Sequence, residues 1–91
     1  MQDFIEAVKT GQVVVLQQFI DNRVDLETRD ENGCTALIWA ARSGQTECAQ
    51  RLVNARADTN AVDNEGATAL LWAAHEGQTK CVELLFDATA Q

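Results

Sequence analysis

The feature that most constrains this fold is an internal repeat of 33 residues. Segment 30–48 recurs, with changes, as segment 63–81, and Gly33, Trp39 and Cys48 are each followed 33 positions later by a residue of the same type. Self-similarity at a fixed period of this length is the sequence signature of stacked repeat architectures, in which each repeat contacts its neighbours. The sequence therefore predicts a stack of similar units, and its 91 residues make one domain.

An earlier and weaker copy precedes the two full ones. When Gly11 is aligned with Gly44, Arg23 falls on Arg56. The predicted division is repeat one (1–29), repeat two (30–62) and repeat three (63–91).

Each full repeat shows the order turn, short helix, loop, second helix. In repeat two, Asn32 and Gly33 indicate a turn, Thr35 stands where an N-cap belongs, Gly44 ends the first helix, and Thr46 is expected to cap the second. Helices of about ten residues are marginal alone in water, so each repeat must pack on its neighbours. We therefore predict an all-α solenoid of three stacked helix–loop–helix repeats joined by β-hairpin-like turns. The expected buried positions of repeat two are Leu37, Ala40 and Ala41 on the first helix and Cys48, Ala49, Leu52 and Val53 on the second.

Charge and cysteine content limit the partners and the compartment. The net charge of −7 disfavours nucleic acid and anionic membranes, both of which attract basic clusters, and favours a protein partner that is basic or apolar at the contact. The chain has no apolar run long enough to span a bilayer, and its opening residues lead us to expect no secretory leader. Three cysteines, two of them at equivalent repeat positions, indicate reduced thiols in an intracellular protein, cytoplasmic or nuclear.

The motif within the period resembles a known family. The order Asp-x-x-Gly-x-Thr-Ala-Leu-x-x-Ala-Ala-x-x-Gly-Gln, followed by Ala-Asp-x-Asn, resembles the ankyrin repeat over nearly the whole chain. Ala36 and Ala69 replace the proline of that family, which should loosen the helix starts slightly. Ile38 and Leu71 replace its histidine, and we expect both to pack apolar surface between repeats.

The two ends of the stack differ. Asp3 and Glu6 stand where later copies have Ala36 and Trp39, which suits a polar end cap. The third repeat carries the apolar run 84–86 and no polar cap. Two alternatives stay open: further repeats follow in the natural protein, or this end meets another chain.

The resemblance implies a concave groove that is lined by the first helices and extended by the hairpin tips. Periodicity agrees, because Trp39, Arg42 and Ser43 share the helix face opposite the buried stripe. The predicted partner-binding residues are Glu6, Lys9, Arg29, Glu31, Asn32, Cys34, Trp39, Arg42, Ser43, Val62, Asn64, Glu65, Ala67, Trp72, His75 and Glu76.

Trp39 and Trp72, the only tryptophans, lie one repeat apart and have two interpretations. In one, they anchor an apolar side chain of a partner, since tryptophan dominates interface hot spots. In the other, they fill space between neighbouring first helices.

The sequence favours neither catalysis nor a cofactor. His75 is the only histidine, which excludes two-histidine metal motifs, and no nucleophile–base set appears. Cys34 lies on a turn and is expected to be exposed, but its acidic surroundings disfavour a reactive thiol. Asn60 resembles an ankyrin-repeat asparagine that an oxygen-sensing hydroxylase modifies, although a structural role in the turn through side-chain-to-backbone bonds is favoured.

These observations predict a protein–protein interaction module. The alternative is a structural element that stacks end to end with another repeat or a second copy of the chain, and an enzyme is the least favoured class.

Overall fold

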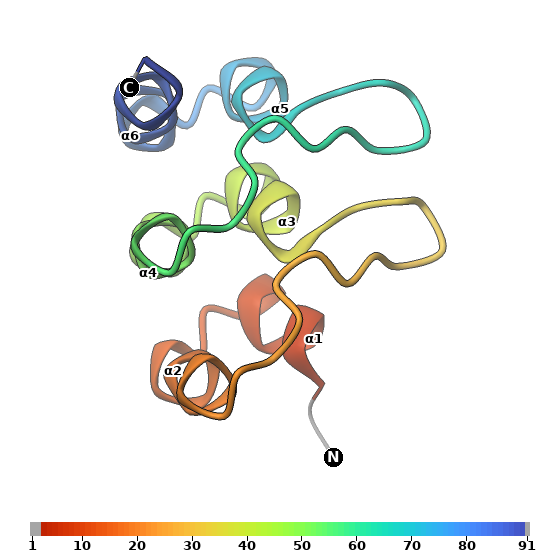
Figure 1. Cartoon of the computed structure of the whole chain (residues 1–91). Helices are drawn as coiled ribbons and strands as arrows, with labels where there is room; N and C mark the ends of the chain where they lie inside the picture. Colours follow the sequence, from red (N-terminus) through yellow and green to blue (C-terminus); the bar gives the residue numbers. More distant parts are fainter. Residues whose placement is uncertain (1–2, 91) are drawn as a thin grey trace.

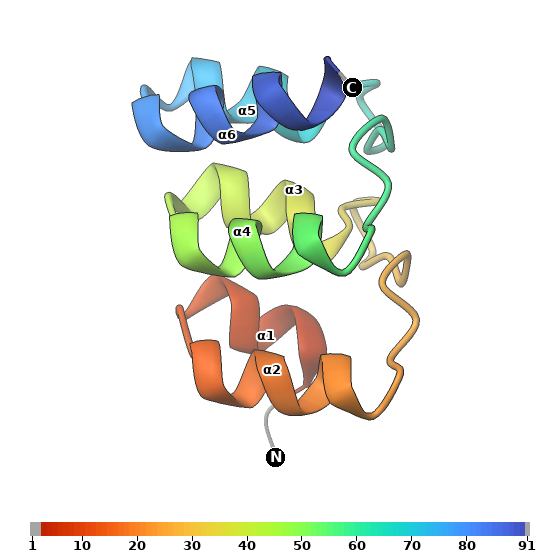
Figure 2. The ribbon, with the colours of Figure 1, turned by 60° about the vertical axis from the view of Figure 1, so that its left-hand side comes forward.

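The computed structural model describes residues 3–90, which form three helix pairs stacked in layers (Figure 1). The helices are α1 (Phe4–Lys9), α2 (Val13–Asp21), α3 (Ala36–Ser43), α4 (Thr46–Asn54), α5 (Ala69–His75) and α6 (Thr79–Thr89). The first helices α1, α3 and α5 form one row and the second helices α2, α4 and α6 form the other, with hairpin-like loops projecting from the α3 and α5 layers (Figures 1 and 2). Within residues 3–90 there are no strands, so the prediction of an all-α repeat stack is confirmed. No helix among these residues is long and apolar enough to cross a membrane.

The first helices start at side-chain caps. The hydroxyls of Thr35 and Thr68 accept the backbone N–H of Ile38 and Leu71 at 3.3 and 3.2 Å, which confirms the predicted cap of α3. The predicted cap of α4 is wrong by one position, because the N-cap is Gln45 and Thr46 is already helical.

The side chain of Gln45 reaches the neighbouring repeat. Its Nε2 donates to the carbonyl of Lys9 at 3.3 Å, and Thr46 Oγ1 lies 3.4 Å from Cys81 Sγ in the third repeat. The start of α4 is therefore stabilised by contacts between repeats, which a local capping rule does not detect.

All five glycines have a positive φ, which other residues adopt at a cost, and two of them, Gly33 and Gly44, show why glycine stands there. Gly44 ends α3 with φ of 70°, and Gly33 turns the hairpin with φ of 77°. A Cβ on Gly33 would also lie 2.9 Å from the backbone nitrogen of Asn64, so the hairpins of neighbouring repeats are close-packed here. The predicted roles of these glycines as a helix end and a tight turn are confirmed.

The core lies between the layers. Leu37, Ala40 and Ala41 are buried as predicted, and Ile38 is buried between repeats. The equivalent expectation for Leu71 is wrong: its side chain is 58% exposed, because the third repeat covers Ile38 and no layer lies above Leu71 in this structure.

The expectation that Cys34 is exposed is also wrong, since it is 0% exposed. The Asp30 carboxylate accepts the Cys34 N–H at 2.9 Å, and the Asp30 N–H donates to the Cys34 carbonyl at 3.1 Å, so the hairpin folds Cys34 inward. Arg42 then covers the thiol, with Nη1 3.6 Å from Sγ. Burial raises the pKa of the Cys34 thiol, which disfavours a reactive thiolate.

After the C-caps of α2 and α4 comes an arginine in the left-handed conformation. Arg23 has φ of 61° and Arg56 has φ of 73°. After α4, Arg56 N–H donates to Val53 and Ala57 N–H donates to Leu52, both at 3.0 Å, which is the Schellman arrangement. Glycine is favoured at this position because a Cβ is strained there.

We expect Arg56→Gly to raise the free energy of unfolding by about 0.5–1 kcal/mol, because relief of left-handed strain exceeds the extra chain entropy of glycine. Urea denaturation of the two proteins measures this change. Arg56→Ala is the control, since it removes the same side chain but keeps the Cβ, and it should give no gain. A glycine variant less stable than the alanine variant would contradict this account of the turn.

Candidate protein-binding face

One carboxylate organises each hairpin and ties it to the helix that follows. Asp30 Oδ1 accepts the backbone N–H of Asn32 and Cys34, each at 2.9 Å, and its Oδ2 accepts the indole Nε1–H of Trp39 at 2.6 Å. Asp63 does the same in the third repeat, where Trp72 Nε1 donates to its Oδ2 at 2.7 Å. Both indoles are therefore fixed against the base of their own hairpin.

Cations are interleaved with these indoles. The ammonium of Lys9 lies 4.2 Å from the ring centre of Trp39, and the Arg42 guanidinium lies 4.3 Å from Trp39 and 4.1 Å from Trp72. His75 meets the Trp72 ring edge-on at 5.7 Å. Because Lys9, Arg42 and His75 are equivalent positions of the repeat, we call these five side chains the aromatic–cation ladder; it runs through all three layers.

The hydrogen bonds change the acidity of both aspartates. At Asp63 the bond from Trp72 is the main influence and lowers the pKa below its ordinary value of 3.8, with smaller contributions from backbone N–H groups and Arg42. At Asp30 burial alone would raise the pKa, but the bonds from Trp39 and two backbone N–H groups outweigh it, so that this pKa is also lowered. Both carboxylates are charged at neutral pH and contribute negative potential beneath the ladder.

The structure brings most of the predicted partner-binding residues onto the first helices and hairpins, with different exposure. Cys34 is buried, and the half-buried set is Lys9, Trp39, Arg42, Ala67 and Trp72. The exposed set is Glu6, Arg29, Glu31, Asn32, Ser43, Val62, Asn64, Glu65, His75 and Glu76. A half-buried aromatic row with an exposed polar border is the arrangement on which protein interfaces are built.

Two of the tip residues also join neighbouring hairpins. Arg29 Nη1 donates to the carbonyl of Gly33 at 2.7 Å and to that of Val62. Asn64 donates from its side chain to the Glu31 carbonyl at 3.3 Å. The tips are therefore a connected surface, and a substitution at either residue would change hairpin packing as well as any contact with a partner.

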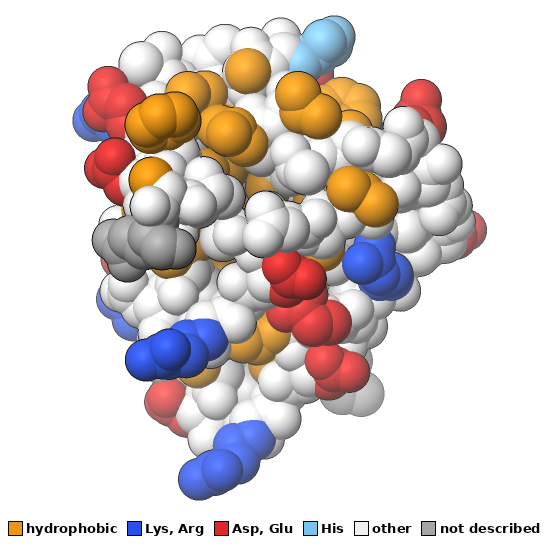
Figure 3. Space-filling model, turned by 45° about the horizontal axis from the view of Figure 1, so that its top comes forward, with side chains coloured by type: hydrophobic (Ala, Val, Ile, Leu, Met, Phe, Trp, Pro, Cys, Tyr) orange, Lys and Arg blue, Asp and Glu red, His pale blue; other side chains and the backbone are white. Residues whose placement is uncertain are grey.

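The indoles combine features of both interpretations. Arg42 contacts both indoles, and Trp39 has two cations within 4.3 Å of its ring centre, as expected of packing. Trp72 also lines a cavity of about 610 Å3 at the α5 end of the stack. Hydrophobic side chains gather at this end beside the single histidine (Figure 3), and Leu71 and Phe86 are its most exposed large members.

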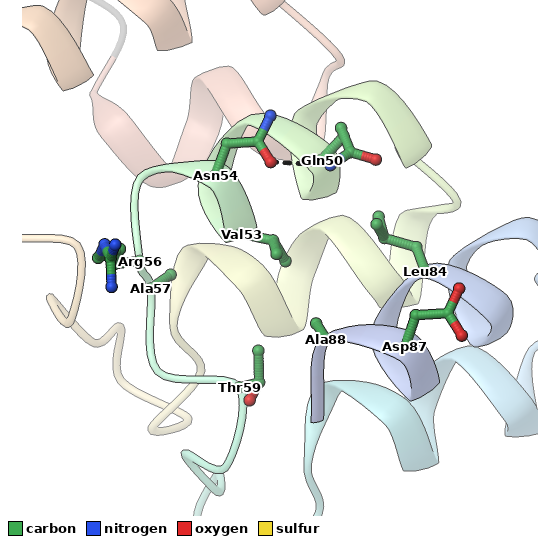
Figure 4. Close-up of a pocket in the computed structure, with 9 residues that line it drawn as sticks. All are labelled: Gln50, Val53, Asn54, Arg56, Ala57, Thr59, Leu84, Asp87 and Ala88. Atoms are coloured by element: carbon green, nitrogen blue, oxygen red, sulfur yellow. Dashed lines mark hydrogen bonds between the residues drawn. The ribbon is translucent and has the colours of Figure 1, made fainter. Parts of the chain in front are cut away.

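A second cleft, of about 580 Å3, lies between α4 and α6 on the other row of helices. Arg56 and Asp87 stand on its opposite sides, and Gln50 donates to Asn54 at its rim (Figure 4). A smaller cleft between α2 and α4 is lined by Gln17, Ile20, Arg51, Asn54 and Ala55, the repeat equivalents of Gln50, Val53, Leu84, Asp87 and Ala88. Because the groove recurs at each step with different side chains, we attribute it to the stacking of the second helices.

Sequence reasoning missed the aspartates as determinants of this face. The predicted face does not include Asp30 or Asp63, although each precedes its tryptophan by the same nine positions in both repeats. That recurring spacing is the signal that could have linked them.

The Asn60 side chain is exposed, and the Asp58 carboxylate accepts the Asn60 backbone N–H at 2.8 Å. Hydroxylation of Asn60 stays a prediction.

We expect Asp63→Asn to lower the free energy of unfolding at pH 7 by about 1.5–3 kcal/mol, the size of a hydrogen bond to a charged group. An amide places an NH2 against either the indole or the backbone N–H groups, so one set of donors loses its acceptor.

The same variant should respond differently to acid. A lowered pKa in the folded state contributes stability that is present above the ordinary pKa of 3.8 and lost as pH falls through the lowered value. Asp63→Asn should therefore lose less stability than the wild type between pH 7 and about pH 2. Denaturation curves at both pH values measure this, with Asp87→Asn, an exposed acid on α6, as the control. Equal acid sensitivity of the wild type and Asp63→Asn would contradict the assigned role.

Comparison with known proteins agrees with the geometry. The family model described as ankyrin repeats matches residues 4–91 with three copies. No curated protein matches the chain. The match covers nearly the whole sequence, and its three copies correspond in number to the three helix pairs. The chain belongs to the ankyrin repeat family.

Proposed function

We propose that this chain is a non-catalytic interaction module that binds a protein partner across the aromatic–cation ladder and the hairpin tips. Ankyrin repeats are generally protein–protein interaction modules and not enzymes. The observation that carries the proposal is the half-buried ladder itself, because its indoles are held in place before a partner arrives. Aromatic side chains that are already held in place lose less conformational entropy on binding, and tryptophan is enriched among interface hot spots.

Charge supports a partner that is basic or apolar at the contact. The net charge is −7, and exposed acids at Glu6, Glu31, Glu65 and Glu76 border the ladder. Such a surface accelerates association with basic proteins and repels nucleic acid and anionic lipid.

The three free, buried cysteines fit a reducing intracellular compartment, which we propose as the location of the protein.

Matched pairs of substitutions test the binding face. Ser43→Arg with Glu76→Arg changes two equivalent exposed positions at the C-terminal ends of the first helices α3 and α5. Gln50→Arg with Glu83→Arg makes the same change in charge on the second helices. Partners captured from a lysate and identified by mass spectrometry are then measured by calorimetry with each protein.

We expect the first-helix pair to weaken a partner about tenfold or more, the scale of a loss near 1.4 kcal/mol, because two long cations would block the ladder. The second-helix pair should leave affinity unchanged. A partner whose affinity falls only with the second-helix pair would place the binding face on the other side of the stack.

A second candidate is end-to-end assembly through the third repeat. Leu71 and Phe86 are 58% and 62% exposed, whereas their equivalents Ile38 and Val53 pack between layers. Stacking would cover this surface with another repeat or a second copy of the chain.

Sedimentation across a concentration series tests this candidate. Assembly through α5 and α6 should raise the mean mass with concentration, and Leu71→Glu with Phe86→Glu should abolish the rise, because charged groups would be buried in the contact. Val14→Glu is the control, since Val14 is 73% exposed and its equivalents Glu47 and Lys80 are exposed in both later repeats. A mass that stays monomeric at every concentration would exclude self-assembly.

A further inference from the structure

We propose that the cavity beside Trp72 is a receptor for one arginine side chain of the partner protein. This proposal rests on the proposed function and deepens it, because it names the chemistry that the third repeat recognises. In the second repeat, an arginine of the same chain, Arg42, lies over the equivalent indole of Trp39.

The two indoles differ in how many cations cover them. Trp39 has Lys9 at 4.2 Å and Arg42 at 4.3 Å. Trp72 has Arg42 at 4.1 Å, and no second cation over its ring is found within residues 3–90. The residue at the position of Arg42 in the third repeat is His75, whose side chain is 74% exposed and meets the indole at its edge. The place of the second cation over Trp72 is therefore open.

The cavity coincides with that open place. It is lined by Glu65, Ala67, Leu71, Trp72, Ala74 and His75, and Arg42 is not part of its wall. Ala67 is the equivalent of Cys34, the residue that Arg42 covers in the second repeat. Three lining residues, Ala67, Trp72 and His75, are thus the repeat equivalents of Cys34, Trp39 and Arg42, and Arg42 contacts the other two in the second repeat.

The walls suit both ends of an arginine side chain. Leu71 and Ala74 offer apolar surface for the methylene stem, the Trp72 ring offers a face for the guanidinium, and the Glu65 carboxylate provides the opposite charge. Trp72 also donates its N–H to the charged Asp63, which adds electron density to the ring. A planar guanidinium stacks on such a face better than a compact ammonium does.

A second copy of the chain fits this cavity less well. In a head-to-tail stack, the residue brought over His75 would be Glu6, the first-repeat equivalent of Trp39 and Trp72. A carboxylate at this position would not reproduce the contact that Trp72 makes with Arg42 of the preceding repeat, and it would add negative charge to an end that already carries Glu65 and Glu76. Like charges in a contact oppose association, so the observations favour a basic partner.

Capped tripeptides are the probes that test this inference. Glycine–arginine–glycine is compared with versions carrying citrulline, a neutral isostere of arginine, and norleucine, an apolar stem. Each is titrated into the 15N-labelled chain while the indole N–H resonances of Trp72 and Trp39 are followed by NMR. We expect the arginine peptide to shift the Trp72 resonance and to bind roughly two- to fivefold more tightly than either neutral peptide, which is the scale of an exposed cation–π contact. The Trp39 resonance should stay in place, because two cations already lie within 4.3 Å of that ring's centre.

A substitution that fills the cavity, without removing a residue that holds the fold together, separates loss of binding from loss of folding. His75→Arg should place a guanidinium over Trp72 from the same chain, as Arg42 does over Trp39, and should abolish peptide binding while helicity is retained. Glu83→Arg, an exposed change on α6 that also introduces an arginine, should bind the peptide as the wild type does. Glu65→Gln should weaken the arginine peptide and leave the norleucine peptide unchanged.

Four results would overturn the inference. Equal binding of the norleucine peptide would make the cavity a receptor for apolar side chains, and a shift of the Trp72 resonance with protein concentration, without peptide, would show that a second copy covers it. Unchanged peptide binding by His75→Arg, or no response to any peptide, would also contradict it. If a partner's affinity still falls with the first-helix substitutions while these peptides fail, the proposed function stands and this inference does not. If the peptides behave as expected but the first-helix substitutions leave the affinity of every partner unchanged, the arginine site stands and the binding face proposed for the partner does not.

Discussion

The hydrogen bond from an indole N–H to the aspartate of the preceding hairpin is the interaction on which the binding face depends. In the second and third repeats the same carboxylate closes the turn through two backbone N–H groups and holds the tryptophan of the following helix. Turn, helix and aromatic ring are therefore positioned together. A side-chain network in which every donor finds an acceptor rigidifies a structure, and loss of one partner leaves a polar group without compensation.

From that bond follows the arrangement of the charged groups around it. With both rings fixed, Arg42 fits between Trp39 and Trp72 and links the second repeat to the third, while Lys9 links the first repeat to the second. The short helices have no independent stability, so these contacts add to the apolar packing of Ile38 and Leu37 between layers. The same side chains thus hold the repeats together and form the surface that a partner would meet, which explains why the face is half-buried before binding.

Much of the fold follows from the sequence, and the details of the face do not. The 33-residue period predicts the stack, Thr35 predicts a helix start, and Gly44 predicts its end, because these are local rules applied at regular spacing. The burial of Cys34, the position of Arg42 and the exposure of Leu71 depend on which segment lies against which in space. Trp39 and Trp72 were found as a pair from their spacing, but their bonds to the hairpin aspartates required the turn to fold back over the helix.

Hydrogen exchange of the two indole N–H groups tests the central claim most directly. If the aspartates hold both rings, the indole protons of Trp39 and Trp72 should exchange roughly ten- to hundredfold more slowly than those of an unfolded peptide, as expected for a bond of about 1.5–3 kcal/mol to a charged acceptor. Both should lose this protection in acid as the carboxylates become protonated. Exchange at the unfolded rate near neutral pH, while the backbone amides of α3 and α5 remain protected, would show that the rings are free and that the face is not preformed.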